Sequence, residues 1–122
     1  MNRPGFTSLQ KDTPMPFDPE YHEQAPTREQ IDQLPGKVVL EFGANWCSHC
    51  QGLSPAVESL LTDADDLQHI RVADGKGKRL GRSFAVKLWP TLVLLSDGKP
   101  IAKLVRPSAE QLQEGFDLLA GS

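Results

Sequence analysis

The chain has 122 residues, a length that suits a single folded domain. Hydrophobic residues make up 39% and charged residues 24%, and the formal net charge of −3 argues against nucleic acid or an anionic membrane as the main partner. No apolar run approaches the roughly 18 residues of a membrane span, and no apolar stretch follows the N-terminus as in a secretory signal. We therefore expect a cytoplasmic protein that makes no membrane contact.

Residues 1–26 differ in composition from the rest of the chain. Their apolar residues are sparse and without period, and they hold five of the ten prolines: Pro4, Pro14, Pro16, Pro19 and Pro26. This composition predicts an extended or partly disordered arm in front of a domain at residues 27–122. Phe6, Phe17 and Tyr21 could pin the arm to that domain as a short edge strand.

The first elements of the domain are expected to be a helix, a strand and a second helix. Thr27 and Gln30 have the spacing of a capping box, and Pro35-Gly36 ends that helix. Residues 38–42 form a short apolar run rich in β-formers, which predicts a buried strand. From Cys47 the apolar spacing becomes helical, through Leu53, Val57, Leu60, Leu61 and Ala64, and Pro55 should kink this helix.

The second half of the chain predicts three further strands and a last helix. Residues 69–73 are a strand candidate, and the polar, glycine-rich residues 74–82 form a loop or short helix. Asp97-Gly98 joins two strands at 91–96 and 101–105 as a hairpin. Ser108 and Gln111 form another capping box before a helix striped by Leu112, Phe116 and Leu119. Helices that alternate with strands predict an α/β fold with parallel crossovers, to which the hairpin adds antiparallel strands.

Cys47 and Cys50 are the only cysteines, and they lie where the strand at 38–42 gives way to a helix. A crosslink between them would close a very small loop and stabilise the fold little. The first turn of a helix carries unpaired N–H groups and partial positive charge, which stabilise a thiolate. The pair therefore predicts redox chemistry. A zinc site shared between two chains is an alternative, although zinc normally takes four ligands.

The chain resembles the thioredoxin family over roughly residues 27–122. The resemblance rests on Trp46-Cys47-Ser48-His49-Cys50, on Trp89-Pro90-Thr91 and on Asp97-Gly98-Lys99, together with Glu41 and Pro55 at matching spacings. It implies a thioredoxin fold with a central mixed sheet of four to five strands and helices on both faces. It also implies a protein-disulfide oxidoreductase, in which Cys47 attacks a substrate disulfide and Cys50 resolves the mixed disulfide.

The resemblance assigns roles to the residues around the dithiol. Glu41 would be a partly buried acid with a pKa raised by desolvation, able to take the proton of Cys50. His49 departs from thioredoxin, which has proline at this position; a hydrogen bond or positive charge from its imidazole would stabilise the Cys47 thiolate and make the disulfide more oxidising than that of thioredoxin. Pro90 would be cis and would expose backbone groups to an extended substrate.

A substrate-binding rim and a set of partners follow from the same resemblance. Trp46, Trp89 and Thr91 would form an apolar rim beside Pro90. The cycle would need no bound metal or cofactor, and electrons would come from NADPH through a thioredoxin-reductase-like flavoenzyme. Protein disulfides would be the substrates of a monomeric protein. Two alternatives stay open: an oxidant or isomerase, suggested by His49, and a non-catalytic binding or chaperone-like module, suggested by a groove that Trp89 and Arg106 narrow.

Overall fold

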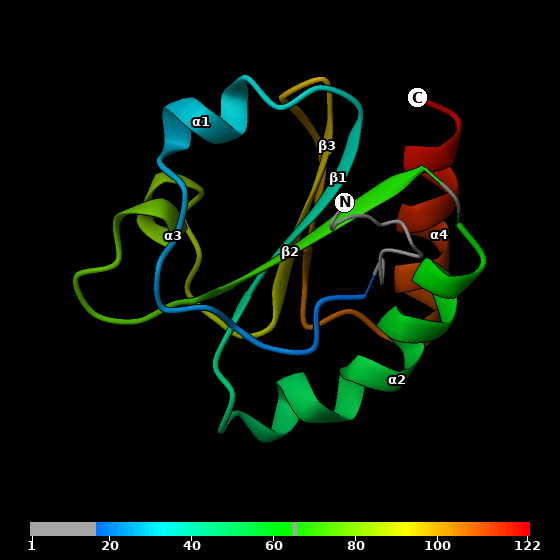
Figure 1. Ribbon diagram of the computed structural model, residues 1–122. Helices are drawn as coiled ribbons and strands as arrows, with labels where there is room; N and C mark the ends of the chain where they lie inside the picture. Colours follow the sequence, from blue (N-terminus) through cyan, green and yellow to red (C-terminus); the bar gives the residue numbers. More distant parts are fainter. Residues whose placement is uncertain (1–16, 65) are drawn as a thin grey trace, which may run out of the picture.

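The computed structural model describes residues 17–64 and 66–122, which form a sheet covered by helices on both faces (Figure 1). The strands are β1 (Lys37–Gly43), β2 (Leu67–Ala73), β3 (Thr91–Ser96) and β4 (Lys99–Val105). The helices are α1 (Arg28–Asp32), α2 (Ser48–Thr62), α3 (Arg79–Ser83) and α4 (Ala109–Ala120). The described residues contain no helix with the length and hydropathy that crossing a membrane requires.

The four-stranded sheet is mixed, as the sequence predicts. The strand order is β2-β1-β3-β4, with β1 parallel to β2 and antiparallel to β3, and with β3 antiparallel to β4. A parallel pair needs a long crossover, which α2 supplies between β1 and β2. The expected thioredoxin fold is therefore confirmed.

Two capping boxes set the starts of α1 and α4. The Thr27 hydroxyl accepts from the Gln30 backbone N–H, while the Gln30 side chain accepts from the Thr27 N–H. Ser108 and Gln111 repeat the arrangement at α4. Each box pairs two backbone N–H groups that the first turn of a helix would otherwise leave unpaired.

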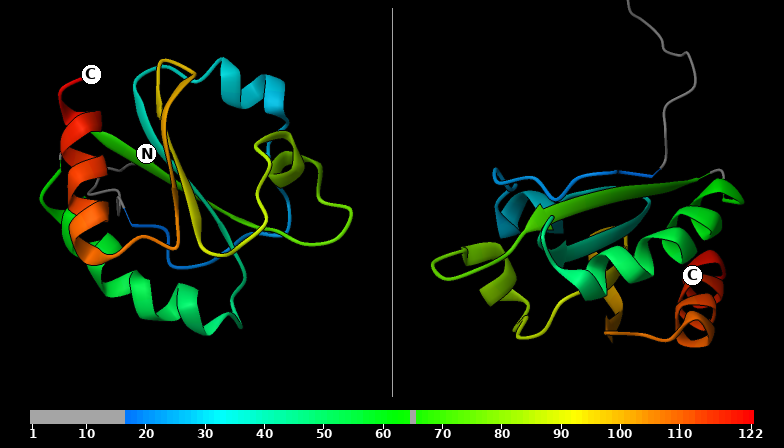
Figure 2. Two further views of the ribbon diagram at one scale, coloured as in Figure 1. Left: turned by 180° about the vertical axis from the view of Figure 1, so that it is seen from behind. Right: turned by 90° about the horizontal axis from the view of Figure 1, so that it is seen from below.

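Strand β1 lies in the centre of the sheet and contributes to two apolar cores. Val38, Leu40 and Phe42 pack against α1 and α3, while Val39 faces the core that α2 and α4 cover. Figure 1 shows α1 and α3 on one side of the strands and α2 and α4 on the other, and the view from behind in Figure 2 shows the same separation. The alternation of side chains along a strand thus decides which core each residue of β1 enters.

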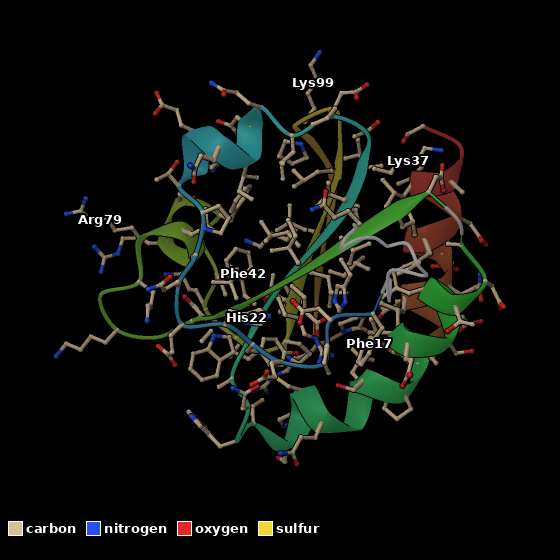
Figure 3. All side chains as sticks on the ribbon, in the orientation of Figure 1. Phe17, His22, Lys37, Phe42, Arg79 and Lys99 are labelled. Carbon is tan, nitrogen blue, oxygen red and sulfur yellow. The ribbon has the colours of Figure 1, made fainter. Side chains whose placement is uncertain are left out.

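Residues 17–26 lie along the outer edge of β2. The His22 N–H donates to the Arg71 carbonyl at 3.3 Å, and the Ala73 N–H donates to the His22 carbonyl at 2.8 Å. Phe17 and Tyr21 are buried, so their expected contact with the domain is confirmed, while Phe6 lies outside the described residues. Figure 3 shows Phe17 on the α2 side of the molecule, away from Phe42.

The β3–β4 hairpin docks onto the turn between α1 and β1. Asp97 and Gly98 both have positive φ, at 50° and 81°, as a tight two-residue hairpin turn requires. The Asp97 carboxylate accepts from the Gly36 N–H at 2.7 Å. A Cβ atom on Gly98 would overlap the carbonyl oxygen of Asp32, whereas a Cβ on Gly36, at φ 78°, would meet no atom within 4 Å.

These two glycines give a matched test of the docking. Gly36→Ala carries only the backbone strain and should lower the free energy of unfolding by about 1–2 kcal/mol. Gly98→Ala adds the overlap with Asp32 and should cost roughly 3 kcal/mol or more. Urea unfolding followed by tryptophan fluorescence measures both values, and equal losses would contradict the close approach of the hairpin to α1.

Candidate active site

The two cysteines occupy the junction between β1 and α2 in unequal positions. Cys47 is the N-cap of α2, and its sulfur accepts the Cys50 backbone N–H at 3.3 Å. Both are free thiols, but Cys47 keeps 7% of its surface exposed and Cys50 keeps none. Of the two residues only Cys47 keeps any exposed surface, and its sulfur receives the N–H donor that stabilises a thiolate.

Cys50 is held as a protonated thiol at neutral pH. Burial, followed by the hydrogen bond with Cys47, raises the pKa of Cys50 to about 11, although a hydrogen bond with Tyr21 acts in the opposite direction. Gly43 makes this packing possible, because a Cβ atom there would lie 2.6 Å from the Cys50 sulfur and 2.7 Å from the Tyr21 ring. The tyrosine ring and the buried thiol thus share the space above Gly43.

The carboxylate of Glu41 is completely buried and has three side chains as hydrogen-bonding partners. Arg71 donates to it through Nε at 3.1 Å and through Nη2 at 3.3 Å. The His69 Nε2 lies 2.9 Å from Oε1, and the Tyr21 hydroxyl donates to Oε2. A buried charge needs partners of this kind, since isolated it would cost far more than the fold can supply.

The expected raised pKa of Glu41 is wrong. Burial is the largest single influence and acts to raise the pKa, but the hydrogen bond from His69, the charge of Arg71 and further contributions from His69 and Tyr21 together outweigh it and lower the pKa. Desolvation by itself would raise the pKa, and the hydrogen-bonding and charged partners, first His69 and then Arg71, reverse the direction of the shift. Glu41 therefore stays ionised and is a weak base.

His69 and Arg71 are site residues that the sequence reasoning missed. They alternate on β2, and the parallel register pairs Arg71 with Glu41 and His69 with Val39, so both side chains share the face of the carboxylate. The Asp18 N–H donates to His69 Nδ1 at 2.9 Å, which leaves the ring proton on Nε2 for Glu41. Two basic residues at positions i and i+2 of a buried strand are the signal that could have identified them.

The buried side chains around Glu41 also connect the N-terminal segment and α2 to the site. The Arg71 guanidinium lies 4.5 Å from the Tyr21 ring centroid and donates to the Ser54 hydroxyl at 2.7 Å. Ser54 in turn donates to the Cys50 carbonyl at 3.0 Å. The Tyr21 backbone is held by Asn45, which accepts from its N–H at 2.9 Å and donates to its carbonyl at 3.1 Å. Tyr21, which the sequence suggested only as a pin for the arm, is thus part of the site.

The loop before β3 faces the dithiol. The Trp89–Pro90 peptide bond is cis, as the resemblance implies. The Trp89 ring packs against the cluster that contains both cysteines, and its indole N–H donates to Asp74 at 2.9 Å. Trp46 is 76% exposed and meets Trp89 edge to face, with ring centroids 5.6 Å apart. The two tryptophans form an apolar surface beside the dithiol.

Thr91 does not reach this surface, contrary to the expectation. Its side chain is fully buried, because Thr91 already belongs to β3 and its hydroxyl donates to the Leu88 carbonyl at 2.6 Å. Leu88 is 47% exposed in the same loop. The sequence pattern is the same for a threonine buried at the start of a strand and for one exposed in the loop before it. Only the packing distinguishes the two cases.

A groove of about 360 Å³ runs between the start of α2 and the cis-proline loop. It is lined by Ser48, His49, Gly52, Leu53, Pro90, Arg106 and Pro107. His49 is exposed in this groove, and within the described part of the chain its imidazole makes no hydrogen bond to Cys47. Any effect of His49 on the dithiol must therefore act through its charge.

Arg106 has an unusual backbone conformation beside this groove. Its φ of 45° lies in the left-handed region, which costs a residue with a side chain about 1–2 kcal/mol. The Arg106 N–H donates to the Pro90 carbonyl at 2.9 Å, and its Nε donates to the Trp89 carbonyl at 2.8 Å. These two bonds hold the guanidinium against the cis-proline loop.

Comparison with known proteins identifies the family. The sequence model described as thioredoxin matches residues 19–117, which is most of the chain. The chain belongs to the thioredoxin family. It is accordingly a thiol–disulfide oxidoreductase whose redox centre is the Cys47–Cys50 dithiol.

Relatives from distant organisms share this fold. The structure of reduced thioredoxin 2 from Pseudomonas aeruginosa is 48% identical, with a TM-score of 0.76 over 84% of this chain and 95% of that one. Thioredoxin from Mycobacterium bovis is 33% identical over 85 residues, 67% of this chain and 73% of that protein. A structure concerning thiol resolution in yeast mitochondrial 1-Cys peroxiredoxin through glutathione and thioredoxin systems matches at 25% identity and a TM-score of 0.68, covering 75% and 86%.

The buried ion pair should dominate the stability of the site. Glu41→Leu leaves Arg71 buried without its anion, and Arg71→Met leaves the carboxylate without its cation. Each should lower the free energy of unfolding by about 3–5 kcal/mol, and the double variant should lose less than the sum of the two. Urea unfolding at pH 7 measures the cycle, with the exposed Glu58→Gln as the control. Additive losses would show that the pair is not coupled.

The lowered pKa of Glu41 also sets a pH dependence. A carboxylate with a depressed pKa in the folded protein contributes stability that is fully present above its ordinary value of 4.5 and is lost as the pH falls below it. Unfolding free energies measured from pH 7 to pH 3 should therefore fall more steeply for the wild type than for Glu41→Gln. Parallel curves would contradict the assignment.

Proposed function

We propose that this chain reduces protein disulfides, with Cys47 as the attacking thiol and Cys50 as the resolving thiol. The observation that supports this assignment is the asymmetry of the pair. Cys47 is the more exposed of the two residues, it lies at the N-terminus of a 15-residue helix, and its sulfur accepts a backbone N–H. Cys50 is buried and protonated, so it cannot react until a substrate is attached to Cys47.

The reaction has two exchange steps. The Cys47 thiolate attacks a substrate disulfide, whose bond breaks, and the first substrate sulfur leaves and takes a proton from water. The Cys50 thiol then loses its proton and attacks the Cys47 sulfur. The bond from Cys47 to the second substrate sulfur breaks, and that sulfur leaves and takes up the proton. Two electrons pass to the substrate, and Cys47 and Cys50 end as a disulfide.

Glu41 acts in this scheme by positioning rather than by storing the proton. Its carboxylate accepts from the Tyr21 hydroxyl and so fixes the ring that packs beside Cys50. Because Arg71 and His69 lower the pKa of Glu41, the carboxylate holds a proton poorly. We assign substrate contact to Trp46, Trp89 and Pro90, since an extended peptide can pair with backbone groups exposed at a cis-proline.

Regeneration of the dithiol requires an electron donor. We propose NADPH, acting through a thioredoxin-reductase-like flavoenzyme, in the cytoplasm. The family membership supports this choice. A donor is needed because the dithiol itself carries only the two electrons of one cycle. Disulfides of peroxiredoxins are candidate substrates by analogy with the yeast mitochondrial system.

Insulin reduction with dithiothreitol as donor tests the assignment. The wild type should accelerate the reaction, and Cys47→Ser should abolish the acceleration because no sulfur remains within reach. Cys50→Ser should instead accumulate a stable mixed disulfide with its substrate, detectable by mass spectrometry. Equal inactivity of the wild type and Cys47→Ser would favour a non-catalytic binding module.

The reduction potential decides between a reductase and an oxidant or isomerase. A positive charge on His49 near the Cys47 thiolate would stabilise the reduced form, so we expect a potential some tens of millivolts above thioredoxin's value of about −270 mV. Replacing His49 with proline should lower it, and His49→Gln should shift it in the same direction because the charge is lost. Equilibration with glutathione, read by tryptophan fluorescence, gives the values; unchanged potentials would remove His49 from the mechanism.

A further inference from the structure

Arg106 holds its guanidinium in the groove that a substrate must enter. Its Nε is bonded to the Trp89 carbonyl, and its backbone N–H is bonded to the Pro90 carbonyl, so the head of the side chain is anchored on the cis-proline loop. Within residues 17–64 and 66–122, neither Nη group donates a hydrogen bond, and no carboxylate lies within 4.0 Å of the guanidinium.

The backbone of Arg106 adopts a conformation that is unfavourable for a residue with a side chain. A φ of 45° suits glycine, and a side chain persists in such a conformation only where its surroundings enforce it. Strained residues of this kind gather at binding sites, where the strain positions a functional group. Here the strained turn directs the side chain of Arg106 back over the loop, where it meets the Trp89 carbonyl.

The charge of the groove is opposite to that of the whole chain. The chain carries a formal charge of −3, but among residues 17–64 and 66–122 no acidic residue lines the groove, whereas Arg106 and His49 both do. The Nη groups, which have no partner among the residues that the structure describes, match a carboxylate, which a guanidinium can bind through two parallel hydrogen bonds. The groove is therefore complementary to an anionic side chain.

We propose that Arg106 binds a carboxylate beside the substrate disulfide, so that the chain prefers protein disulfides flanked by Asp or Glu. This inference rests on the proposed reductase function and specifies its substrate class. Arg106 would select the substrate and take no part in the exchange of sulfurs. A substrate whose cysteine lies over Cys47 brings its neighbouring residues into the groove, since the groove begins at the start of α2, directly after Cys47.

Three peptide disulfides test the preference. Each is the symmetrical disulfide dimer of one short peptide, with Glu, Gln or Lys on both sides of the cysteine. We expect kcat/KM for the Glu peptide to exceed that for the Gln peptide by about three- to tenfold, with the Lys peptide lowest. Rates with dithiothreitol alone correct for the intrinsic reactivity of each disulfide. The preference should shrink as salt is raised, because the contact is electrostatic.

Substitutions of Arg106 and Lys99 separate the effect of the Arg106 charge from effects on folding and on the size of the side chain. Arg106→Gln should reduce the Glu preference to near unity, and Arg106→Lys should restore part of the preference. Lys99→Gln removes the same charge at the hairpin, far from the start of α2 in Figure 3, and should leave the preference unchanged.

The outcomes distinguish this inference from the function on which it rests. Reduction of all three peptides at equal corrected rates by the wild type would overturn the carboxylate site and leave the reductase intact. A uniform rise in all three rates for Arg106→Gln would also overturn it, because Arg106 would then only obstruct the groove. Failure of the wild type to reduce any peptide, or insulin, would instead refute the proposed function.

Discussion

The ion pair between Glu41 and Arg71 is the interaction on which the active site is built. A carboxylate and a guanidinium buried together are tolerable only when the remaining hydrogen-bonding groups also find partners. His69, Tyr21 and Ser54 provide those partners, and each comes from a different part of the chain. The requirement to satisfy one buried charge therefore brings β1, β2, α2 and the N-terminal segment into a single arrangement, which Tyr21 connects to the dithiol cluster.

The unequal burial of the two cysteines follows from that arrangement. Tyr21 and Gly43 enclose Cys50 completely, while Cys47, which precedes the first turn of α2, keeps a small exposed surface. Burial keeps Cys50 protonated, and the helix terminus supplies Cys47 with a donor N–H. In the proposed reaction Cys47 thereby begins the exchange, and Cys50 completes it.

The cis-proline loop supplies the opposite wall of the site. Trp89 lies between the dithiol cluster and Asp74, and its carbonyl carries the guanidinium of Arg106. The same loop thus combines an apolar surface formed by tryptophan with a fixed positive charge. A family that shares one reaction can differ in substrates through groups placed in this way, because the charge acts on the residues around the disulfide and leaves the sulfur chemistry unchanged.

Local sequence patterns determined the elements of this protein. The capping boxes at Thr27 and Ser108, the Asp97-Gly98 turn and the position of Cys47 at a strand–helix junction are encoded within a few residues, since each depends on backbone hydrogen bonds between near neighbours. The sign of the Glu41 pKa shift, the burial of Thr91 and the role of Tyr21 could not be found in this way. They depend on β2, the cis-proline loop and the N-terminal segment meeting β1 in space, and electrostatic and packing energies are decided by partners that are distant in the chain.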